Sequence, residues 1–196
     1  MAYNETSWAT SGTTSTVGQA GPTLYTHFGV GADQMSGLGA GVHYAIPFNN
    51  TIVGSGNNDI DFGTGTDPAT TFTTANIDTQ YASQIVPMMW YVPDNIYIDS
   101  VHSIVGADAA NGDTLRLHLL SYAYTSGSTS TLSDGIVLAS SSSDVTSAGN
   151  KQTYLSSFTV SSPSVASGRV ILAFIRIDAD NNSDYSLNIT VKYHVN

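Results

Sequence analysis

The fold is decided by the C-terminal stretch Tyr185-Ser186-Leu187-Asn188-Ile189-Thr190-Val191-Lys192-Tyr193-His194-Val195. Its odd-numbered residues are apolar or aromatic and its even-numbered residues are polar, so the two kinds alternate without interruption. Because successive side chains of a β-strand point to opposite faces, this alternation predicts a strand with one buried face. We expect the odd-numbered residues to line the core and the even-numbered ones to face solvent or another subunit.

Segments upstream of this stretch also have the patterns of strands. Residues 169–177 are apolar on both faces, which is typical of a central strand covered on both sides. Residues 95–105 are apolar but change phase near Asp99-Ser100, which predicts a β-bulge. Other strands are expected at 88–92, 115–120, 136–139 and 154–160, and shorter ones at 24–28, 42–46, 60–62 and 70–74.

No amphipathic segment of helix length separates these strands. The sequence therefore predicts an all-β fold, an antiparallel β-sandwich that is jelly-roll-like and has an extended N-terminal arm. We expect residues 1–22 to form the arm, because they are of low complexity. Residues 23–85 are a Gly-rich segment with short strands of the same domain, and residues 86–196 are the core sandwich.

The composition excludes several classes of protein. The chain of 196 residues has 26 Ser and 23 Thr, and only 10% of its residues are charged, against about 25% in an average soluble protein. It has no Cys, so disulfides, thiolate zinc sites and cysteine nucleophiles are excluded. There is no run of about 18 apolar residues, so we expect no membrane span. The N-terminus has neither the basic nor the apolar region of a secretory signal.

Charge is distributed unevenly along the chain. Residues 1–115 contain no Lys or Arg, and the whole chain has a formal net charge of −10. A surface that binds phosphate backbones or anionic lipids needs clustered cations. We therefore expect neither nucleic acid nor membrane as a partner.

One loop resembles part of a calcium site. Asp178, Asp180, Asn182 and Asp184 lie between the two clearest strands, and oxygen ligands at i, i+2 and i+4 can surround a hard cation. However, the sequence lacks the glycine and the bidentate glutamate of a calcium loop, so a polar hairpin turn explains the same residues. We expect no bound metal and no cofactor.

No catalytic signature is present in the sequence. There is no Gly-x-Ser-x-Gly elbow, and the only Glu is Glu5, in the arm, which leaves no marked pair of carboxylates. The five His residues have no spacing that indicates a shared metal. We expect a protein that is not an enzyme.

Aromatic residues are the remaining signal. Trp8 lies in the polar arm, and the pairs Trp90-Tyr91 and Tyr122 with Tyr124 lie in or beside expected strands. Tyr and Trp are enriched both in cores and at subunit interfaces. These five residues are candidates for an interface with another protein or subunit, with core packing and a sugar-stacking platform as the alternatives.

The second half of the chain resembles virion structural proteins of tailed bacteriophages, of the jelly-roll capsid decoration (cement) or fibre type. The resemblance rests on Tyr91-Val92-Pro93-Asp94-Asn95, Ile98 to Val105, Leu115 to Tyr124, Arg169 to Ile177 and Val191 to Val195. It implies a virion component made in the host cytoplasm and placed on the capsid exterior. Its partners would be the major capsid protein and itself, as a homotrimer.

Three functions are compatible with these observations. The first is a structural protein that decorates and stabilises a phage capsid as an oligomer, with arms that reach across neighbouring subunits. The second is a carbohydrate-binding or receptor-binding fibre module on the same sandwich, which predicts exposed aromatics at a concave site. The third is a hydrolase on that fold.

Overall fold

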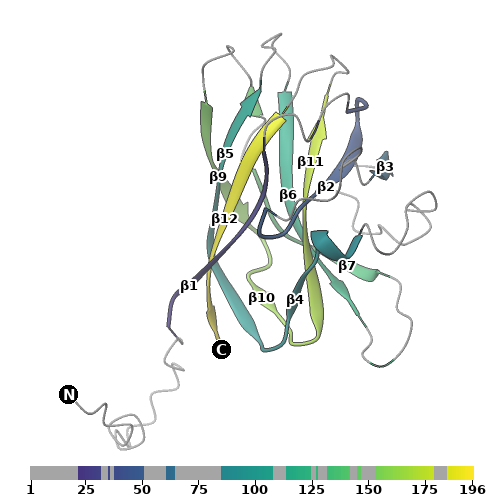
Figure 1. Ribbon diagram of the computed structural model, residues 1–196. Helices are drawn as coiled ribbons and strands as arrows, with labels where there is room; N and C mark the ends of the chain where they lie inside the picture. The colour runs from purple at the N-terminus through teal and green to yellow at the C-terminus, as the bar shows by residue number, and fades with distance from the viewer. Residues whose placement is uncertain are drawn as a thin grey trace, which may run out of the picture.

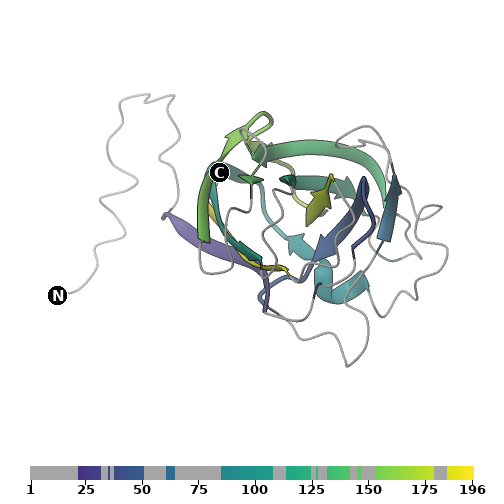
Figure 2. The same cartoon turned by 90° about the horizontal axis from the view of Figure 1, so that it is seen from above.

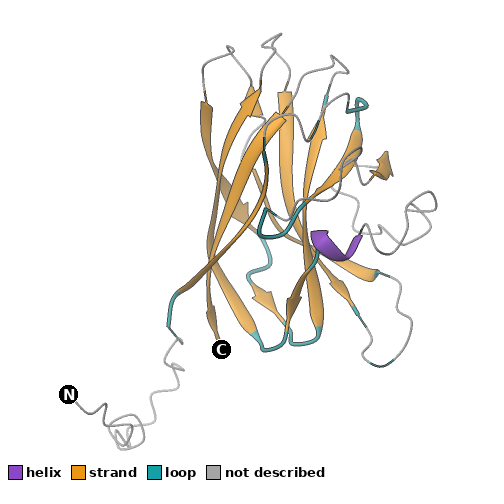
Figure 3. Ribbon diagram, in the orientation of Figure 1, coloured by secondary structure: helices purple, strands orange, loops and turns teal. Residues whose placement is uncertain are grey.

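The computed structural model describes residues 22–31, 35, 38–50, 61–64, 85–107, 114–124, 127, 132–141, 145–146, 153–178 and 185–196. Antiparallel strands dominate these residues, with a single 3-10 turn among them (Figures 1 and 3). In chain order the elements are β1 (Leu24–Val30), β2 (Val42–Ile46), β3 (Asp61–Thr64), η2 (Val86–Met88), β4 (Trp90–Val92), β5 (Ile96–Ala107), β6 (Thr114–Ala123), β7 (Ser133–Ser141), β8 (Val145–Thr146), β9 (Thr153–Val160), β10 (Ser164–Val165), β11 (Arg169–Ile177) and β12 (Tyr185–Val195).

The strands form one continuous hydrogen-bonded sheet that curls so that two layers, which we call the first and the second sheet, face each other (Figure 2). The first sheet has the order β1-β12-β5-β9, with β10 also paired to β5. The second sheet has the order β7-β6-β11-β2-β3, with β4 paired to β11 and β8 to β6. The predicted all-β antiparallel sandwich is therefore confirmed.

Strand β9 joins the two sheets along one edge. Its first part, residues 153–157, pairs with β5, and its last part, residues 158–160, pairs with β7. Strands that change sheets in this way form the corners of sandwiches. Where β9 leaves β5, β10 takes its place, and the N–H of Ile98 donates to the carbonyl of Pro163 (2.8 Å).

The opposite edge is closed by β1 and the turn that follows β2. Phe28 forms an isolated bridge with Phe48, and the N–H of Gly29 donates to the carbonyl of Pro47 (2.9 Å). The rings of Phe28 and Phe48 lie 5.3 Å apart, and the Phe48 ring stacks on Trp90 at 6.0 Å. These contacts connect the first sheet to the second on the side away from β9.

The main core lies between the two sheets. From β12 it receives Tyr185, Leu187, Ile189 and Val191, all buried, while Tyr193 and Val195 are half-buried against it. From β11 it receives Ile171, Ala173, Ile175 and Ile177. The predicted alternation of the last strand is confirmed, because Thr190 is exposed and its even-numbered neighbours are at most half-buried.

A second core covers the outer face of the second sheet. The other side of β11 contributes Val170, Leu172 and Phe174, which pack with Leu120 and Tyr122 of β6. Phe62 of β3, and Ile85 and Met88 at η2, lie over them, and Phe62 meets Phe174 edge-on at 4.8 Å. The prediction that residues 169–177 are covered on both faces is confirmed.

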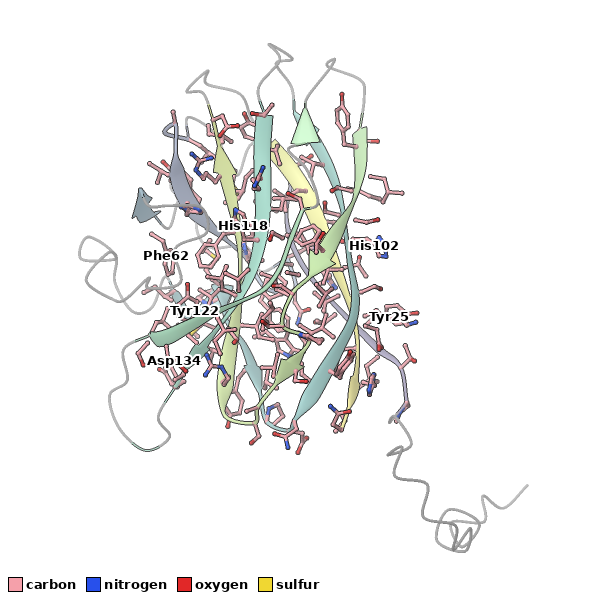
Figure 4. All side chains as sticks on the ribbon, turned by 180° about the vertical axis from the view of Figure 1, so that it is seen from behind. Tyr25, Phe62, His102, His118, Tyr122 and Asp134 are labelled. Carbon is pink, nitrogen blue, oxygen red and sulfur yellow. The ribbon has the colours of Figure 1, made fainter. Side chains whose placement is uncertain are left out.

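The two outer faces of the sandwich therefore differ. The second sheet is covered by residues of the chain between β2 and β4, whereas the first sheet exposes Tyr25, His102, Ile104 and Leu155. Figure 4 shows Tyr25 and His102 on one flank and Phe62 and Tyr122 on the other.

All seven strands expected after residue 86 are present, as β4, β5, β6, β7, β9, β11 and β12. The predicted bulge is also present, because Ser100 pairs with Lys192 and Ile98 with Tyr193, which leaves Asp99 as the extra residue. The expected strands at 24–28, 42–46 and 60–62 correspond to β1, β2 and β3, and β1 and β2 pair with the later strands β12 and β11. Residues 70–74, and residues 1–21 of the expected arm 1–22, lie outside the described residues.

A pair of substitutions in β12 tests which face is buried. Val191→Asp places a carboxylate at a site with no exposed surface, between the two sheets. We expect a loss of several kcal/mol, which is a large part of the roughly 5–15 kcal/mol that stabilises a domain. The urea midpoint of unfolding measures this loss.

The matched control is Thr190→Asp, one residue away on the exposed face. It should change the free energy of unfolding by less than about 1 kcal/mol. Equal destabilisation by the two substitutions would contradict the one-sided burial of β12.

Candidate functional site

Four exposed tyrosines lie at one end of the sandwich, which we call the tyrosine end: Tyr25, Tyr91, Tyr97 and Tyr124. They are 66%, 54%, 37% and 39% exposed, respectively, and every other tyrosine among the described residues is less exposed. The end is the lower one in Figure 1, where β1 and β5 begin and β6 and β12 finish.

Strand register places these four residues toward the same end of the two sheets, with Tyr25 and Tyr97 on the outer face of the first sheet and Tyr91 on the outer face of the second. Tyr25 pairs with Lys192 and Tyr97 with His194, near the end of β12. Tyr91 pairs with Val170, the second residue of β11, and Tyr124 follows directly after β6, whose last residue, Ala123, pairs with Arg169. Two of the tyrosines therefore belong to each sheet.

The Tyr97 side is supported by an ionisable pair at the bulge. The His194 ring stacks on Tyr97 with centroids 5.2 Å apart, and its Nδ1 lies 3.0 Å from Oδ1 of Asp99. Asp99 is the bulged residue, without a register partner in β12, and its carboxylate lies against this histidine. Tyr97 is thus held on one side by a ring that is itself hydrogen-bonded.

The Tyr91 and Tyr124 side is supported by Arg169. Its Nε donates to Oγ of Ser121 (3.0 Å), its Nη2 to the carbonyl of Ser121 (3.1 Å), and its Nη1 to Oδ2 of Asp134 (2.9 Å). Asp134 has a positive φ of 50°, an uncommon conformation for a residue with a side chain. The guanidinium therefore joins β11, the end of β6 and the start of β7.

Loop hydrogen bonds complete the frame of this end. Oδ1 of Asn95 accepts from the N–H of Ser167 (2.9 Å), and the N–H of Gly168 donates to the carbonyl of Val92 (2.8 Å). Gly168 has φ +82°, which a residue with a side chain adopts only at a cost. These bonds connect the β4–β5 turn to the β10–β11 turn, so Tyr91 and Tyr124 project from a braced surface.

The aromatic candidates from the sequence separate into two groups. Trp90 is 8% exposed and meets Tyr193 edge-on at 4.9 Å, and Tyr122 has no exposed surface. Both are therefore core residues of this chain, which was one of the alternatives expected from the sequence, because each is packed by residues of its own domain. Tyr91 and Tyr124 are exposed, and Trp8 lies outside the described residues.

The sequence did not single out Tyr25 and Tyr97. Tyr97 lies between the buried Ile96 and Ile98, so period two assigns it to the outer face. Local sequence patterns do not predict which strands pair. The pairing of β1, β4, β5 and β6 with their neighbours brings the four tyrosines to the same end.

The buried hydroxyl of Tyr122 has no hydrogen-bond partner among the described residues. It lies in the outer core over β6, β11 and η2. Burial raises the pKa of this hydroxyl far above its usual range, so it stays protonated.

Of the calcium candidates, only Asp178 lies among the described residues. Its Oδ1 lies 2.6 Å from Nη1 of Arg176, and its Oδ2 accepts from Oγ1 of Thr114. Its carboxylate therefore already has an ion-pair and a hydroxyl partner. Asp180, Asn182 and Asp184 lie outside the described residues.

The histidines occupy separate places. His43 and His118 are buried beneath the covered outer face, with ring centroids 5.7 Å apart. His27 and His102 lie on the first sheet, each paired with Thr190 of β12. Within the described part of the chain, no three His, Cys, Asp or Glu residues group as metal ligands.

Comparison with known proteins adds no relative. The chain matches no protein-family model and no curated protein. No helix among the described residues has the length and apolar character needed to span a lipid bilayer.

Removal of the Tyr122 hydroxyl tests its cost to the fold. Tyr122→Phe keeps the ring and deletes a buried polar group that has no partner in the described structure. Such a group costs about 1–3 kcal/mol, so we expect this variant to raise the free energy of unfolding by about 1 kcal/mol. The urea midpoint should rise, and a lower midpoint would show that the hydroxyl makes a stabilising bond.

Proposed function

We propose that this protein is a structural component of a phage virion that decorates and stabilises the capsid by binding the major capsid protein as an oligomer. A homotrimer on the capsid exterior is the assembly that the sequence resemblance implies. In this proposal the protein acts mechanically and performs no chemistry.

The observation that supports the proposal is the tyrosine end. Tyrosine buries a large apolar area, offers a hydroxyl for hydrogen bonds, and loses little conformational freedom when it is fixed. Exposed tyrosines toward one end of a small domain, two on each sheet, are therefore suited to docking between or against protein surfaces. Toward the opposite end, Tyr154 is half-buried, and no described tyrosine there is as exposed as these four.

The bracing of this end favours tight docking. Arg169 and the loop bonds of Asn95 and Gly168 hold the turns before an interface is formed. A surface that is already ordered loses less entropy on association.

The position of β1 adds a second contact. The described chain enters β1 at Leu24, at the tyrosine end, so residues 1–22 are attached beside the proposed docking surface. If the arm binds a neighbouring capsid subunit while the end is docked, its weak contact becomes intramolecular and strengthens the whole attachment. Three such arms in a trimer would connect several capsid subunits.

Substitution of two tyrosines tests the docking surface. The double variant Tyr91→Ser, Tyr124→Ser removes two exposed rings from one side of the end. We expect the dissociation constant for expanded capsids, made from the major capsid protein of the same genome, to rise at least tenfold. Co-sedimentation with these capsids measures it, and the urea midpoint should stay close to that of the parent protein.

Leu155→Ser is the matched control. Leu155 is 75% exposed but lies on β9, away from the tyrosine end. Its substitution should leave capsid binding unchanged. If the double variant binds as well as the parent, or the control weakens binding equally, the tyrosine end is not the docking surface.

Deletion of residues 1–20 tests the arm. The described core contains no residue before Phe28, so the shortened protein should keep its urea midpoint. Capsid affinity should fall, because one of the linked contacts is lost. Loss of folding, or unchanged affinity, would each contradict this part of the proposal.

A further inference from the structure

The open face of the first sheet contains a hollow of about 550 Å³. Nine residues line it: Val30, Gly31, Asn50, Ile104, Gly106, Thr153, Ser186, Leu187 and Asn188. Its volume lies within the roughly 300–1,000 Å³ of small-molecule sites. It lies along the half of β12 and β5 that is away from the tyrosine end. Tyr91 and Tyr124 belong to the other sheet.

Gly106 lines the hollow and leaves its strand without a side chain at that point. A Cβ added there would lie 3.6 Å from Oγ of Ser186 and 3.8 Å from Cγ2 of Thr153, which are ordinary contacts. Its backbone also lies outside the region of φ that favours glycine. Neither packing nor conformation therefore requires glycine at this strand position, where it is normally unfavourable.

Asn50 forms one wall through an unusual turn. Asn49 and Asn50 have φ values of 54° and 52°, in the left-handed region, and the N–H of Asn49 donates to the carbonyl of His27 (3.0 Å). The turn places Oδ1 of Asn50 directly over Gly29, where a Cβ would lie only 2.0 Å from it. The side-chain amide of Asn50 lines the hollow, and no hydrogen bond joins it to another described residue.

A second, smaller hollow of about 190 Å³ continues along β12. It is lined by Tyr25, Thr26, His27, Asn188 and Thr190. Asn188 belongs to both hollows, and its Oδ1 accepts from Oγ1 of Thr190 (3.2 Å). From Ser186 to Thr190 the strand rises by about 13 Å, which suits a short linear ligand.

The chemistry of the lining selects the class of ligand. None of the described residues around the larger hollow carries a charge, so an ionic ligand would find no counter-charge there. Asn50, Asn188, Ser186 and Thr153 offer amides and hydroxyls, and Ile104 is an apolar side chain that is 53% exposed. Amides and hydroxyls bind sugar hydroxyls, and the C–H faces of sugar rings pack on apolar and aromatic side chains such as Tyr25.

From this geometry we infer that the two hollows form one binding site for a short neutral oligosaccharide. One end of the oligosaccharide packs near Tyr25, and the adjoining sugars lie over Gly106 between Asn50 and Asn188. The site is open, so binding is weak for one domain and gains strength from several copies. This inference does not depend on the capsid proposal.

Filling the hollow provides the test. Gly106→Val adds a β-branched side chain that suits a strand and occupies the space above Gly106. Ser157→Val is the matched control, because it adds the same side chain on the exposed face of β9, outside both hollows. Both variants should fold with urea midpoints close to that of the parent protein.

The probes are neutral di- to tetrasaccharides of glucose, galactose, mannose and N-acetylglucosamine, with sialylated trisaccharides as the anionic comparison. In amide NMR spectra of the full chain, neutral sugars should shift the signals of Gly106, Ser186 and Asn188. The dissociation constant should rise at least tenfold in Gly106→Val and in Asn188→Ala, and should not change in Ser157→Val.

Three results would overturn the inference. They are the absence of shifts with every neutral sugar, binding that persists in Gly106→Val, and binding of the sialylated probes alone. Because Tyr91 and Tyr124 lie outside both hollows, their double variant should bind sugars normally. A failure of capsid binding and a failure of sugar binding can thus be told apart.

Discussion

The burial of β11 on both faces is the constraint on which the rest of the structure depends. One side of this strand packs against the first sheet, and the other side presents Val170, Leu172 and Phe174, which must also be removed from water. The chain between β2 and β4 contributes Phe62, Ile85 and Met88 to cover them. No such apolar row lies on the outer side of β12, and the outer face of the first sheet exposes Ile104 and Leu155, which can contact other molecules.

Local patterns account for the elements but not for their partners. The alternation of residues 185–195, the apolar run of 169–177 and the phase change at Asp99 each predicted a feature that is present, because period two depends only on neighbouring residues. The change of sheet within β9 and the two-residue strands β8 and β10 have no such signal. Of the neighbours Trp90 and Tyr91, the sequence could not tell which is buried, since β4 is three residues long and its facing depends on β11.

The two surfaces proposed for binding differ in chemistry because one is built on turns and the other on the middle of a sheet. At the tyrosine end, turns fixed by Arg169 and Asn95 carry large rings outward. On the open sheet, Gly106 removes a side chain from the middle of a strand, and the surrounding amides and hydroxyls become the walls of a hollow. Tyr25 belongs to both surfaces, so a molecule bound at one surface would contact a residue of the other.

The antiparallel pairing of β1 with β12 has a mechanical consequence. β1 is entered at the tyrosine end and pairs with β12 over seven residues, from Leu24 opposite Tyr193 to Val30 opposite Leu187. A pull on the chain before Leu24, directed away from the sandwich along the strand, loads these hydrogen bonds in shear, so they resist together. A pull across the sheet would break them one after another at much lower force. A tether that leaves along β1 is therefore anchored in the direction in which the pairing of β1 with β12 resists separation most.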